Sequence, residues 1–351
     1  MKKLRAGILG ATGVVGQQFV RILSNHPFFE TVVVTGSARS SGKPYKDATD
    51  WIVTNNPPEN VTDLDVLDTN TKVILRNDID LVFSSLPSDV AYSIEDELAS
   101  AGVPVFSNAG AHRMKESVPI LIPEINPSHL NLVSSQQYGE GFIVTNSNCS
   151  TSGLVFGLKP LMDFGINDVI VTTYQAVSGA GRNGVGSMDI LGNVIPYISN
   201  EETKIAQETQ IILGCKENGK IVPAPFDVNA SCARVPVLNG HLESVVVQLE
   251  REFSVDQIIE AFNSFSGEPQ ALDLPTAPSN PIIVCQEPDR PQPTRDLSLQ
   301  VGDLGMAVKI GRVRKQKDRL NFFLLVHNAI RGAAGASVLN AEFARVKGVI
   351  E

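Results

Sequence analysis

Residues 4–16 read LRAGILGATGVVG, a short apolar run that passes directly into three glycines spaced three residues apart. The run at residues 4–9 is typical of a buried strand, residues 17–23 have a helical pattern, and the β-branched residues 31–35 predict a second strand. A strand, a helix and a strand in this order form a βαβ unit. The sequence therefore predicts that the chain begins with a parallel sheet covered by helices.

The three glycines lie where such a unit binds phosphate. Gly10 and Gly13 allow a tight turn and a close approach of a pyrophosphate to the backbone, and Gly16 lets the helix pack closely on the strand. The N-terminus of that helix would then face the phosphates. The spacing G-x-x-G-x-x-G departs from the commoner G-x-G-x-x-G, so an ordinary glycine-rich turn is the alternative to a dinucleotide site.

The end of the second predicted strand indicates which dinucleotide would bind. Residues 35–43, TGSARSSGK, contain no carboxylate that could bond the ribose 2′-hydroxyl of NAD. Their hydroxyls, together with Arg39 and Lys43, suit the 2′-phosphate of NADP, which a guanidinium binds with two parallel hydrogen bonds. The sequence favours NADP here, and a solvated polar loop is the alternative.

The alternation of strand and helix patterns continues to about residue 148 and then changes. Before that point we expect strands at residues 80–84, 103–107 and 142–145 and a helix at 89–101. Beyond it we expect strands at residues 169–174, 243–250, 305–311 and 320–327 and helices at 200–213 and 329–346. Residues 287–296 contain three prolines, which lack the amide donor of regular structure, so we expect a loop there. The change of pattern predicts a domain boundary near Cys149.

Composition limits the classes of partner. The chain has 351 residues, of which 42% are hydrophobic, enough for more than one core. A net charge of −9 argues against a general nucleic-acid or membrane-surface role. No apolar run reaches the roughly 18 residues that cross a bilayer, and the first residues lack the core of a signal peptide, so we expect a cytoplasmic protein. The four cysteines have no paired spacing, which predicts free thiols and no metal site.

One of these cysteines has the position of a nucleophile. Cys149 follows a predicted strand and precedes an apolar helix that we expect to start near Thr151. The positive end of a helix dipole favours the reactive thiolate. Acyl chemistry at a thiolate also needs a proton donor and acceptor, and histidine suits this role near neutral pH. His241, seven residues past Arg234, precedes a strong strand pattern, although such a histidine alone is more often structural.

Four segments together resemble one family. Residues 148–151 (NCST), 175–181 (QAVSGAG), 234–241 (RVPVLNGH) and 328–335 (NAIRGAAG) are similar to aspartate-β-semialdehyde dehydrogenases, and the likeness covers nearly the whole chain. The short NCST form looks closer to the archaeal and fungal branch than to the enterobacterial one. The resemblance implies an N-terminal Rossmann domain, residues 1–148 plus 329–351. It also implies a mixed α/β catalytic and dimerisation domain of the glyceraldehyde-3-phosphate dehydrogenase kind, residues 149–328.

The resemblance also implies an activity. Members of the family use NADPH to reduce L-aspartyl β-phosphate to L-aspartate β-semialdehyde through a cysteine thioester, on the route to lysine, threonine, methionine and isoleucine. A homodimer or homotetramer is expected. The implied catalytic residues are Cys149 as nucleophile, His241 as general acid and base, and Gln175, which orients the acyl group.

The substrate and cofactor residues follow from the same likeness. For the substrate they are Asn148, Arg234 for the α-carboxylate, Glu201 for the α-ammonium, and Arg113 and Lys204 for the phosphate. For NADP they are Gly10, Thr12, Gly13, Val14, Val15, Ser37, Arg39, Ser40, Ser84, Ser178, Gly179 and Asn328. Glu202 adjoins Glu201, and only the helix register decides between them. Taken singly, Glu201 and Lys204 look like an exposed helical ion pair.

Three other functions fit parts of the pattern. A malonyl-CoA reductase would use the same thioester chemistry on a similar scaffold, but its substrate has no ammonium group for Glu201. An N-acetyl-glutamyl-phosphate reductase fits less well, because its acylated nitrogen is neutral. A non-catalytic dinucleotide sensor would have no use for Cys149, Gln175 and His241 together.

Overall fold

The computed structural model describes residues 2–217, 219–297 and 304–351, and these divide into two compact units. The first comprises the chain up to Leu121 together with Ser128–Asn146 and Ala333–Glu351. The second comprises Ile122–Pro127 and Ser147–Gly332. Across the described ranges, no helix is long and apolar enough to span a membrane.

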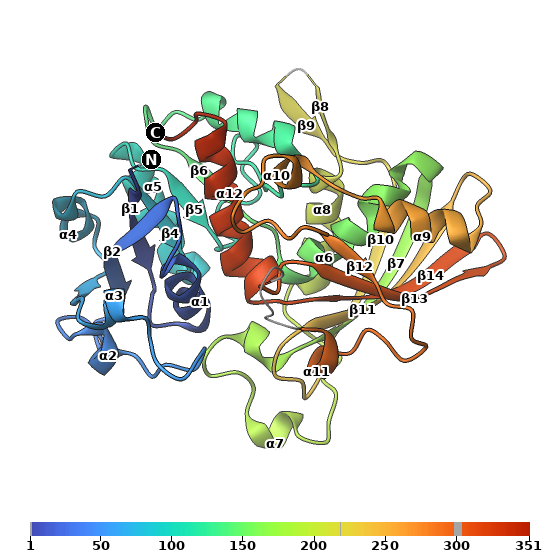
Figure 1. The fold of residues 1–351 in the computed structure, drawn as a ribbon, viewed down its shortest axis with the longest axis horizontal. Coiled ribbons are helices and arrows are strands. Elements are labelled where there is room, and N and C mark those ends of the chain that lie inside the picture. The colour runs from blue at the N-terminus through green and yellow to red at the C-terminus, as the bar shows by residue number, and fades with distance from the viewer. Residues whose placement is uncertain (1, 218, 298–303) are drawn as a thin grey trace. The chain divides into compact units, whose positions relative to one another are not determined.

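The first unit contains a six-stranded sheet in the order β3-β2-β1-β4-β5-β6, and every neighbouring pair is parallel (Figure 1). This strand order is that of the Rossmann fold, which confirms the expected fold class. Its strands are β1 Leu4–Leu9, β2 Phe29–Gly36, β3 Val66–Asp68, β4 Leu81–Ser84, β5 Val105–Ser107 and β6 Ile143–Thr145. Its helices are α1 Val14–Leu23, α2 Tyr45–Ala48, α3 Glu59–Thr62, α4 Thr71–Ile74, η1 Leu75–Asn77, α5 Ser88–Ser100 and α12 Gly335–Val346, with η2 Pro127–Ser135 at its border.

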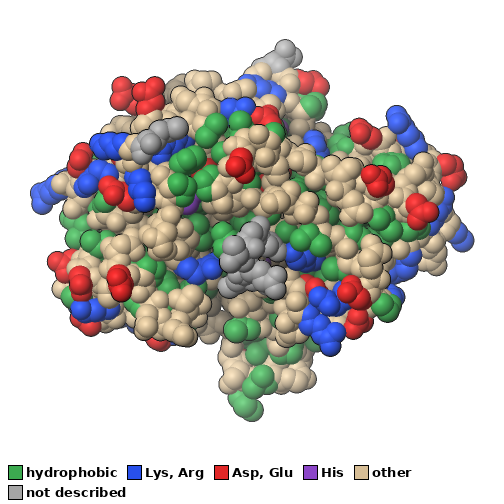
Figure 2. All heavy atoms as spheres, in the orientation of Figure 1, with side chains coloured by type: hydrophobic (Ala, Val, Ile, Leu, Met, Phe, Trp, Pro, Cys, Tyr) green, Lys and Arg blue, Asp and Glu red, His purple; other side chains and the backbone are tan. Residues whose placement is uncertain are grey.

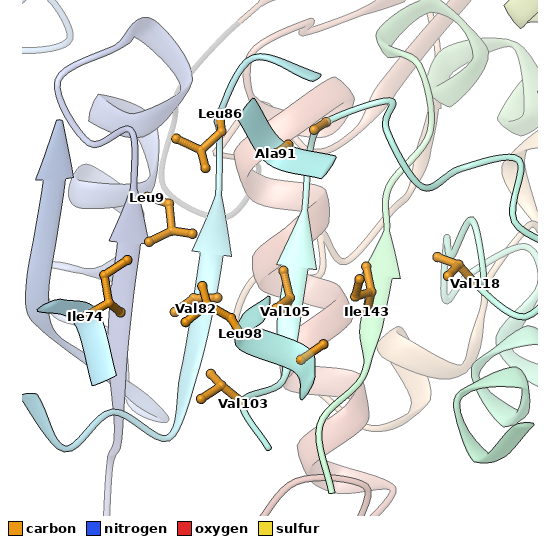
Figure 3. Packing of buried hydrophobic residues seen from close by; sticks show 12 residues of the cluster. Leu9, Ile74, Val82, Leu86, Ala91, Leu98, Val103, Val105, Val118 and Ile143 are labelled. Atoms are coloured by element: carbon orange, nitrogen blue, oxygen red, sulfur yellow. The ribbon is translucent and has the colours of Figure 1, made fainter. Parts of the chain in front are cut away.

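Helix α5 covers one face of this sheet. Figure 3 shows Ala91 and Leu98 of the helix among side chains from the strands, including Val82 of β4, Val105 of β5 and Ile143 of β6. All five are fully buried. Because both faces of a parallel sheet are covered in such folds, its strands appear in the sequence as continuous apolar runs, which is why all of them except the short β3 could be located.

The second unit is built around a mixed six-stranded sheet in the order β10-β7-β11-β14-β13-β12. Its outer pairs, β10 with β7 and β12 with β13, are parallel, and the three inner pairs are antiparallel. The strands are β7 Ile166–Gln175, β10 Asp227–Arg234, β11 His241–Leu249, β12 Ile282–Val284, β13 Val308–Gln316 and β14 Arg319–Val326, and a separate hairpin pairs β8 Cys215–Glu217 with β9 Lys220–Val222. The helices are α6 Cys149–Leu158, η3 Lys159–Phe164, η4 Val177–Ala180, α7 Ser187–Ile190, α8 Glu201–Ile212, α9 Val255–Asn263, α10 Glu268–Ala271 and α11 Pro293–Asp296, and the irregular η5 Ile330–Ala334 includes the last residues of this unit, which ends at Gly332.

Three sequence predictions need correction. The helix expected near Thr151 begins at Cys149 itself. The proline-rich loop contains one helical turn, α11, with Pro293 in the first turn, where the missing amide has no helical partner to lose. The last helix does not run unbroken from residue 329, because Ala333 has non-helical angles (φ −154°, ψ −106°) and α12 starts at Gly335.

Candidate active site

The ends of three strands in the second unit meet at one edge of its sheet. Gln175 ends β7 and Arg234 ends β10, and these two residues are register partners in the parallel pair. Strand β11 runs antiparallel to β7, so its first residue, His241, lies at the same edge. Two helices also begin at residues predicted for the site, α6 at Cys149 and α8 at Glu201.

Cys149 and His241 form a close pair. The Cys149 Sγ atom lies 3.2 Å from the His241 Nε2 atom. On the other side of the ring, the backbone N–H of Ala176 donates to His241 Nδ1 at 3.1 Å. A backbone amide can only donate, so Nδ1 accepts and the proton of the neutral ring resides on Nε2, facing the sulfur.

The surroundings of His241 keep its ring neutral. Its side chain is fully buried. Burial, together with the positive charge of Arg234, lowers the pKa of His241 to about 3. The neutral imidazole with its proton on Nε2 is therefore the resting form at neutral pH.

Asn148 fixes the turn in front of the nucleophile. It is the N-cap of α6, and its Oδ1 accepts from the backbone amides of Ser150 and Thr151 at 2.9 and 3.1 Å. Its Nδ2 donates to Glu201 Oε1 at 2.9 Å. Gly332 lies against the same turn, where an added Cβ would come within 2.7 Å of the Cβ of Cys149.

The helical register of α8 gives its two neighbouring acids, Glu201 and Glu202, different partners. Glu201 is 5% exposed and accepts from Gln175 Nε2 at 3.0 Å as well as from Asn148. Glu202 accepts instead from the backbone amide of Cys232 at 3.2 Å. Lys204 is exposed. The structure thus places Glu201 inside the site beside Gln175, and the interpretation of Glu201 as one half of an exposed ion pair is wrong.

Arg234 lies over the same edge. Its side chain is 7% exposed, and its Nη1 donates to the Ala176 carbonyl at 2.8 Å. Burial lowers the pKa of its guanidinium. Gly179 lies against the guanidinium of Arg234 and the imidazole of His241, since an added Cβ would lie 2.8 Å from Arg234 Nη1 and 3.2 Å from His241 Cε1. Gly179 therefore lies too close to the arginine and the histidine for a side chain to fit without displacing them.

Asn328 ties two parts of this edge together. Its Nδ2 donates to Ser178 Oγ at 2.9 Å, and its Oδ1 accepts from the backbone amide of Gly240 at 2.8 Å. Asn328 and Ser178 were both predicted as cofactor residues, and their side chains are in direct contact. The side-chain amide of Asn328 thereby also holds Gly240, the residue before His241.

The predicted cofactor residues of the first unit surround the turn between β1 and α1. Gly13 is the N-cap of α1, no side chain caps that helix, and its first turn contains no acidic residue. Gly10 has φ +73°, and a Cβ on Gly16 would lie 2.2 Å from the Gly10 carbonyl oxygen. Both positions therefore require glycine. The remaining predicted residues of the turn are Thr12, Val14 and Val15.

Other predicted residues of the first unit follow its strands. Ser37, Arg39 and Ser40 come directly after β2, where Arg39 is exposed and the Ser40 amide donates to the Ser37 carbonyl at 2.8 Å. Ser84 ends β4 and is fully buried. Arg113 is partly buried and donates from Nη2 to the Asn108 carbonyl at 2.7 Å. These residues fit a phosphate-rich ligand, because neither the glycine turn nor the Ser37–Ser40 turn carries a carboxylate.

The other thiols differ from Cys149 in their surroundings. All four cysteines are free. Burial raises the pKa of Cys232 to about 12 and raises that of Cys285, and a hydrogen bond to Glu217 raises that of Cys215. A raised pKa lowers the thiolate fraction and with it the reactivity of these three side chains.

Two buried acids beside the site were missed in the sequence. Glu208 of α8 accepts from the backbone amide of Asn148 at 2.5 Å, and Glu243 of β11 is fully buried two residues after His241. Glu208 lies seven residues after Glu201, a helical spacing that places both on one face. Glu243 shares the inward face of β11 with His241. These spacings were the available signals.

The comparisons with known proteins first define a class. Residues 5–133 match the model described as the semialdehyde dehydrogenase NAD binding domain, and residues 158–331 match the semialdehyde dehydrogenase dimerisation domain. Together these matches cover most of the chain. The chain is thus a member of the semialdehyde dehydrogenase class.

The individual relatives narrow that class. Aspartate-semialdehyde dehydrogenase of Methanothermobacter thermautotrophicus is 47% identical over 97% of this chain and 98% of its own, and that of Archaeoglobus fulgidus is 48% identical over 96% of each. The crystal structure of aspartate semialdehyde dehydrogenase with NADP from Candida albicans has a TM-score of 0.90 and 40% identity, covering 99% of this chain and 100% of that one. The chain belongs to the aspartate-semialdehyde dehydrogenase family, and the expected likeness to archaeal and fungal members is confirmed.

Proposed function

We propose that this chain reduces L-aspartyl β-phosphate to L-aspartate β-semialdehyde with NADPH, releasing inorganic phosphate. The observation that carries the proposal is the pair of Cys149 Sγ and His241 Nε2 at 3.2 Å, with the Ala176 amide fixing the proton on Nε2. A nucleophile and a proton donor in contact are what acyl transfer followed by reduction requires. The product is a precursor in the formation of lysine, threonine, methionine and isoleucine.

The buried charges of the site match the ends of this substrate. Arg234 would bind the α-carboxylate with the part of its guanidinium that Ala176 does not use. Glu201 would bind the α-ammonium beside Gln175, whose amide would orient the acyl group. We assign the phosphate to Arg113 and Lys204, with Asn148 next to the reacting carbon. A malonyl-CoA reductase would leave the buried Glu201 without a cationic partner.

The first half of the reaction is acyl transfer to the cysteine. The Cys149 sulfur attacks the β-carbonyl carbon, the bond from that carbon to the phosphate oxygen breaks, and phosphate leaves with the bonding pair. A thioester of Cys149 remains. The Nε2–H of His241 donates to the thiolate before attack and becomes free to donate to the carbonyl oxygen once the sulfur is acylated.

The second half is reduction of the thioester. When bound, NADPH supplies the hydride that adds to the thioester carbon. The Nε2–H of His241 donates a hydrogen bond to the oxygen as negative charge develops there and stabilises the tetrahedral alkoxide on Cys149. The alkoxide then re-forms the carbonyl, the carbon–sulfur bond breaks, and the sulfur leaves as a thiolate that again accepts from Nε2–H. The aldehyde is released and the resting pair is restored.

The residues suited to NADP occur in both units. The uncapped N-terminus of α1, with Gly10 and Gly13, would bind the pyrophosphate, contacted also by Thr12, Val14 and Val15. Arg39, with Ser37 and Ser40, would bind the 2′-phosphate. The nicotinamide end is assigned to Ser84, Ser178, Gly179 and Asn328. The hydrogen bond from Asn328 to Ser178 supports the grouping of these two residues.

The match to a dimerisation domain supports an oligomer, and we propose a homodimer or homotetramer. Apolar side chains around α7 are exposed in the single chain, with Met188 at 92%, Leu191 at 70% and Tyr197 at 67%. Figure 2 shows hydrophobic side chains gathered on the segment that Figure 1 labels α7. Burial between copies of the chain would remove this surface from water. We also propose a cytoplasmic location, because the free thiol of Cys149 needs a reducing compartment.

A direct assay of NADP reduction tests the proposal. Purified protein should reduce NADP with aspartate semialdehyde only when phosphate is present, and it should not oxidise NADPH with malonyl-CoA. Phosphate-dependent turnover that disappears in Cys149→Ser supports the assignment. Turnover with malonyl-CoA, or binding of NADP without either reaction, would replace it with one of the alternative functions.

A further inference from the structure

Helix α8 carries a second buried acid that the proposed reaction does not use. Glu208 is 2% exposed, and its Oε2 accepts from the backbone N–H of Asn148 at 2.5 Å. Glu201, two helical turns earlier, accepts from the side chain of the same asparagine at 2.9 Å. One helix face therefore holds both the backbone and the side chain of the residue that precedes the nucleophile.

Asn148 is also the N-cap of helix α6, which begins at Cys149. As an N-cap it has non-helical angles, φ −52° and ψ 147°, and its own amide has no partner inside α6. Its Oδ1 accepts from the Ser150 and Thr151 amides. The backbone amide of Asn148 instead donates to Glu208 Oε2, which is the acceptor that the structure records for it. Without it, a buried backbone donor would lose that bond.

We propose that Glu208 is a positioning residue for Cys149, whose carboxylate fixes the Asn148 amide and thereby holds the sulfur against His241. The inference rests on the proposed function, since it gives Glu208 a task at the same nucleophile. Reacting atoms must be held within about 0.5 Å of their productive positions. A displaced sulfur therefore slows acylation, whereas Arg234 and Glu201 continue to bind the substrate. The expected signature is a fall in kcat with little change in KM.

Two substitutions distinguish the length of the Glu208 side chain from its charge. Glu208→Gln keeps the length of the side chain and an oxygen that accepts a hydrogen bond, so kcat should stay within about threefold of the wild type. Glu208→Asp keeps the carboxylate but is one methylene, about 1.5 Å, too short for the Asn148 amide, and kcat should fall roughly 10- to 100-fold. The KM for aspartate semialdehyde should change by less than about threefold in both. The matched controls are Glu260→Gln and Glu260→Asp at an exposed position of α9, which should leave both constants unchanged.

A measurement without substrate distinguishes failure of the Glu208 proposal from failure of the proposed function. The rate of iodoacetamide modification at Cys149, followed by peptide mapping, should fall in Glu208→Asp and remain near the wild-type rate in Glu208→Gln. Modification of Cys149 that leaves activity intact would instead refute the proposed function, whatever Glu208 does. Thermal unfolding of each variant establishes that it is folded.

Two results overturn the proposal. One is a Glu208→Asp enzyme with wild-type kcat and wild-type alkylation rate. The other is a Glu208→Gln enzyme that loses tenfold or more in kcat, because charge and not hydrogen-bond reach would then be the property that matters. Should Glu208→Asp fail to fold, Glu208→Ala, which removes the acceptor, takes its place with the same expected fall in kcat and alkylation rate, and wild-type values in that variant overturn the proposal.

Discussion

Arg234→Lys keeps the positive charge at the centre of the site but removes the planar fork that carries it. Arg234 Nη1 donates to the Ala176 carbonyl at 2.8 Å from a side chain that is 7% exposed. One ammonium on a flexible stem cannot keep this contact and also clasp a carboxylate with two parallel bonds. Losing one charged hydrogen bond costs about 1.5 to 3 kcal/mol, which corresponds to a roughly 10- to 100-fold drop in kcat/KM.

The loss should divide between kcat and KM for a structural reason. Ala176 accepts from Arg234 through its carbonyl and donates to His241 through its amide, so a shift of this residue also disturbs the proton donor. Steady-state kinetics on a folded variant give both constants. Arg319→Lys is the matched control, since Arg319 is 37% exposed and pairs with Asp168 at 3.4 Å, and it should change kcat/KM less than about twofold. A value within twofold for Arg234→Lys would refute the carboxylate clamp.

Three further perturbations probe other parts of the site. Arg39→Ala should raise the KM for NADPH far more than that for NADH, and equal effects would place Arg39 outside the 2′-phosphate pocket. Gly179→Ala should lower kcat/KM at least about tenfold without lowering the melting temperature, because its Cβ would lie 2.8 Å from Arg234 Nη1 and would displace the guanidinium, and unchanged kinetics would contradict close packing of Gly179 against Arg234. Burial, with a contribution from the Glu201 carboxylate, raises the pKa of Glu243 well above its ordinary value, so the stability that this group contributes is present at low pH and is lost as pH rises. Glu243→Gln should therefore gain melting temperature over the wild type between about pH 5 and about pH 8, and a gap that does not widen would argue against a buried neutral acid.

Most of the Rossmann half could be predicted because its strands are largely buried, whereas the short strand β3, with one buried residue of three, was not predicted. The strand expected at residues 4–9 is β1, and the runs predicted for β2, β4, β5 and β6 lie within about two residues of the observed ones. Strand β10 was missed for the opposite reason. Only Cys232 and Arg234 of its eight residues are buried, so it has no apolar run. Its place in the sheet depends on pairing with β7.

The end of the chain shows how tertiary contacts override a local pattern. The alanine-rich run from residue 329 favours one continuous helix. In the structure the Arg331 carbonyl accepts from Ser152 Oγ, and the Arg331 side chain pairs with the buried Glu124 and donates to the Met306 carbonyl. These bonds hold the segment in an irregular turn before α12 begins. No local propensity indicates them.

The nucleophile was predictable from local sequence, and its supports were not. Cys149 could be found because the strand before it and the helix after it are both legible. The Ala176 amide contacts His241 only because of the register between β7 and β11, which the sequence does not provide. The choice of Glu201 over Glu202 likewise depends on the rotation of α8 relative to α6.

The most direct test of the account is to trap the acyl enzyme. Protein mixed with L-aspartyl β-phosphate in the absence of NADPH, quenched in acid and mapped by mass spectrometry, should carry an aspartyl thioester on Cys149. Addition of NADPH before the quench should remove the adduct and release one aldehyde for each thioester lost. An unmodified Cys149 under turnover conditions, or an adduct on Cys215, Cys232 or Cys285 instead, would contradict the central claim.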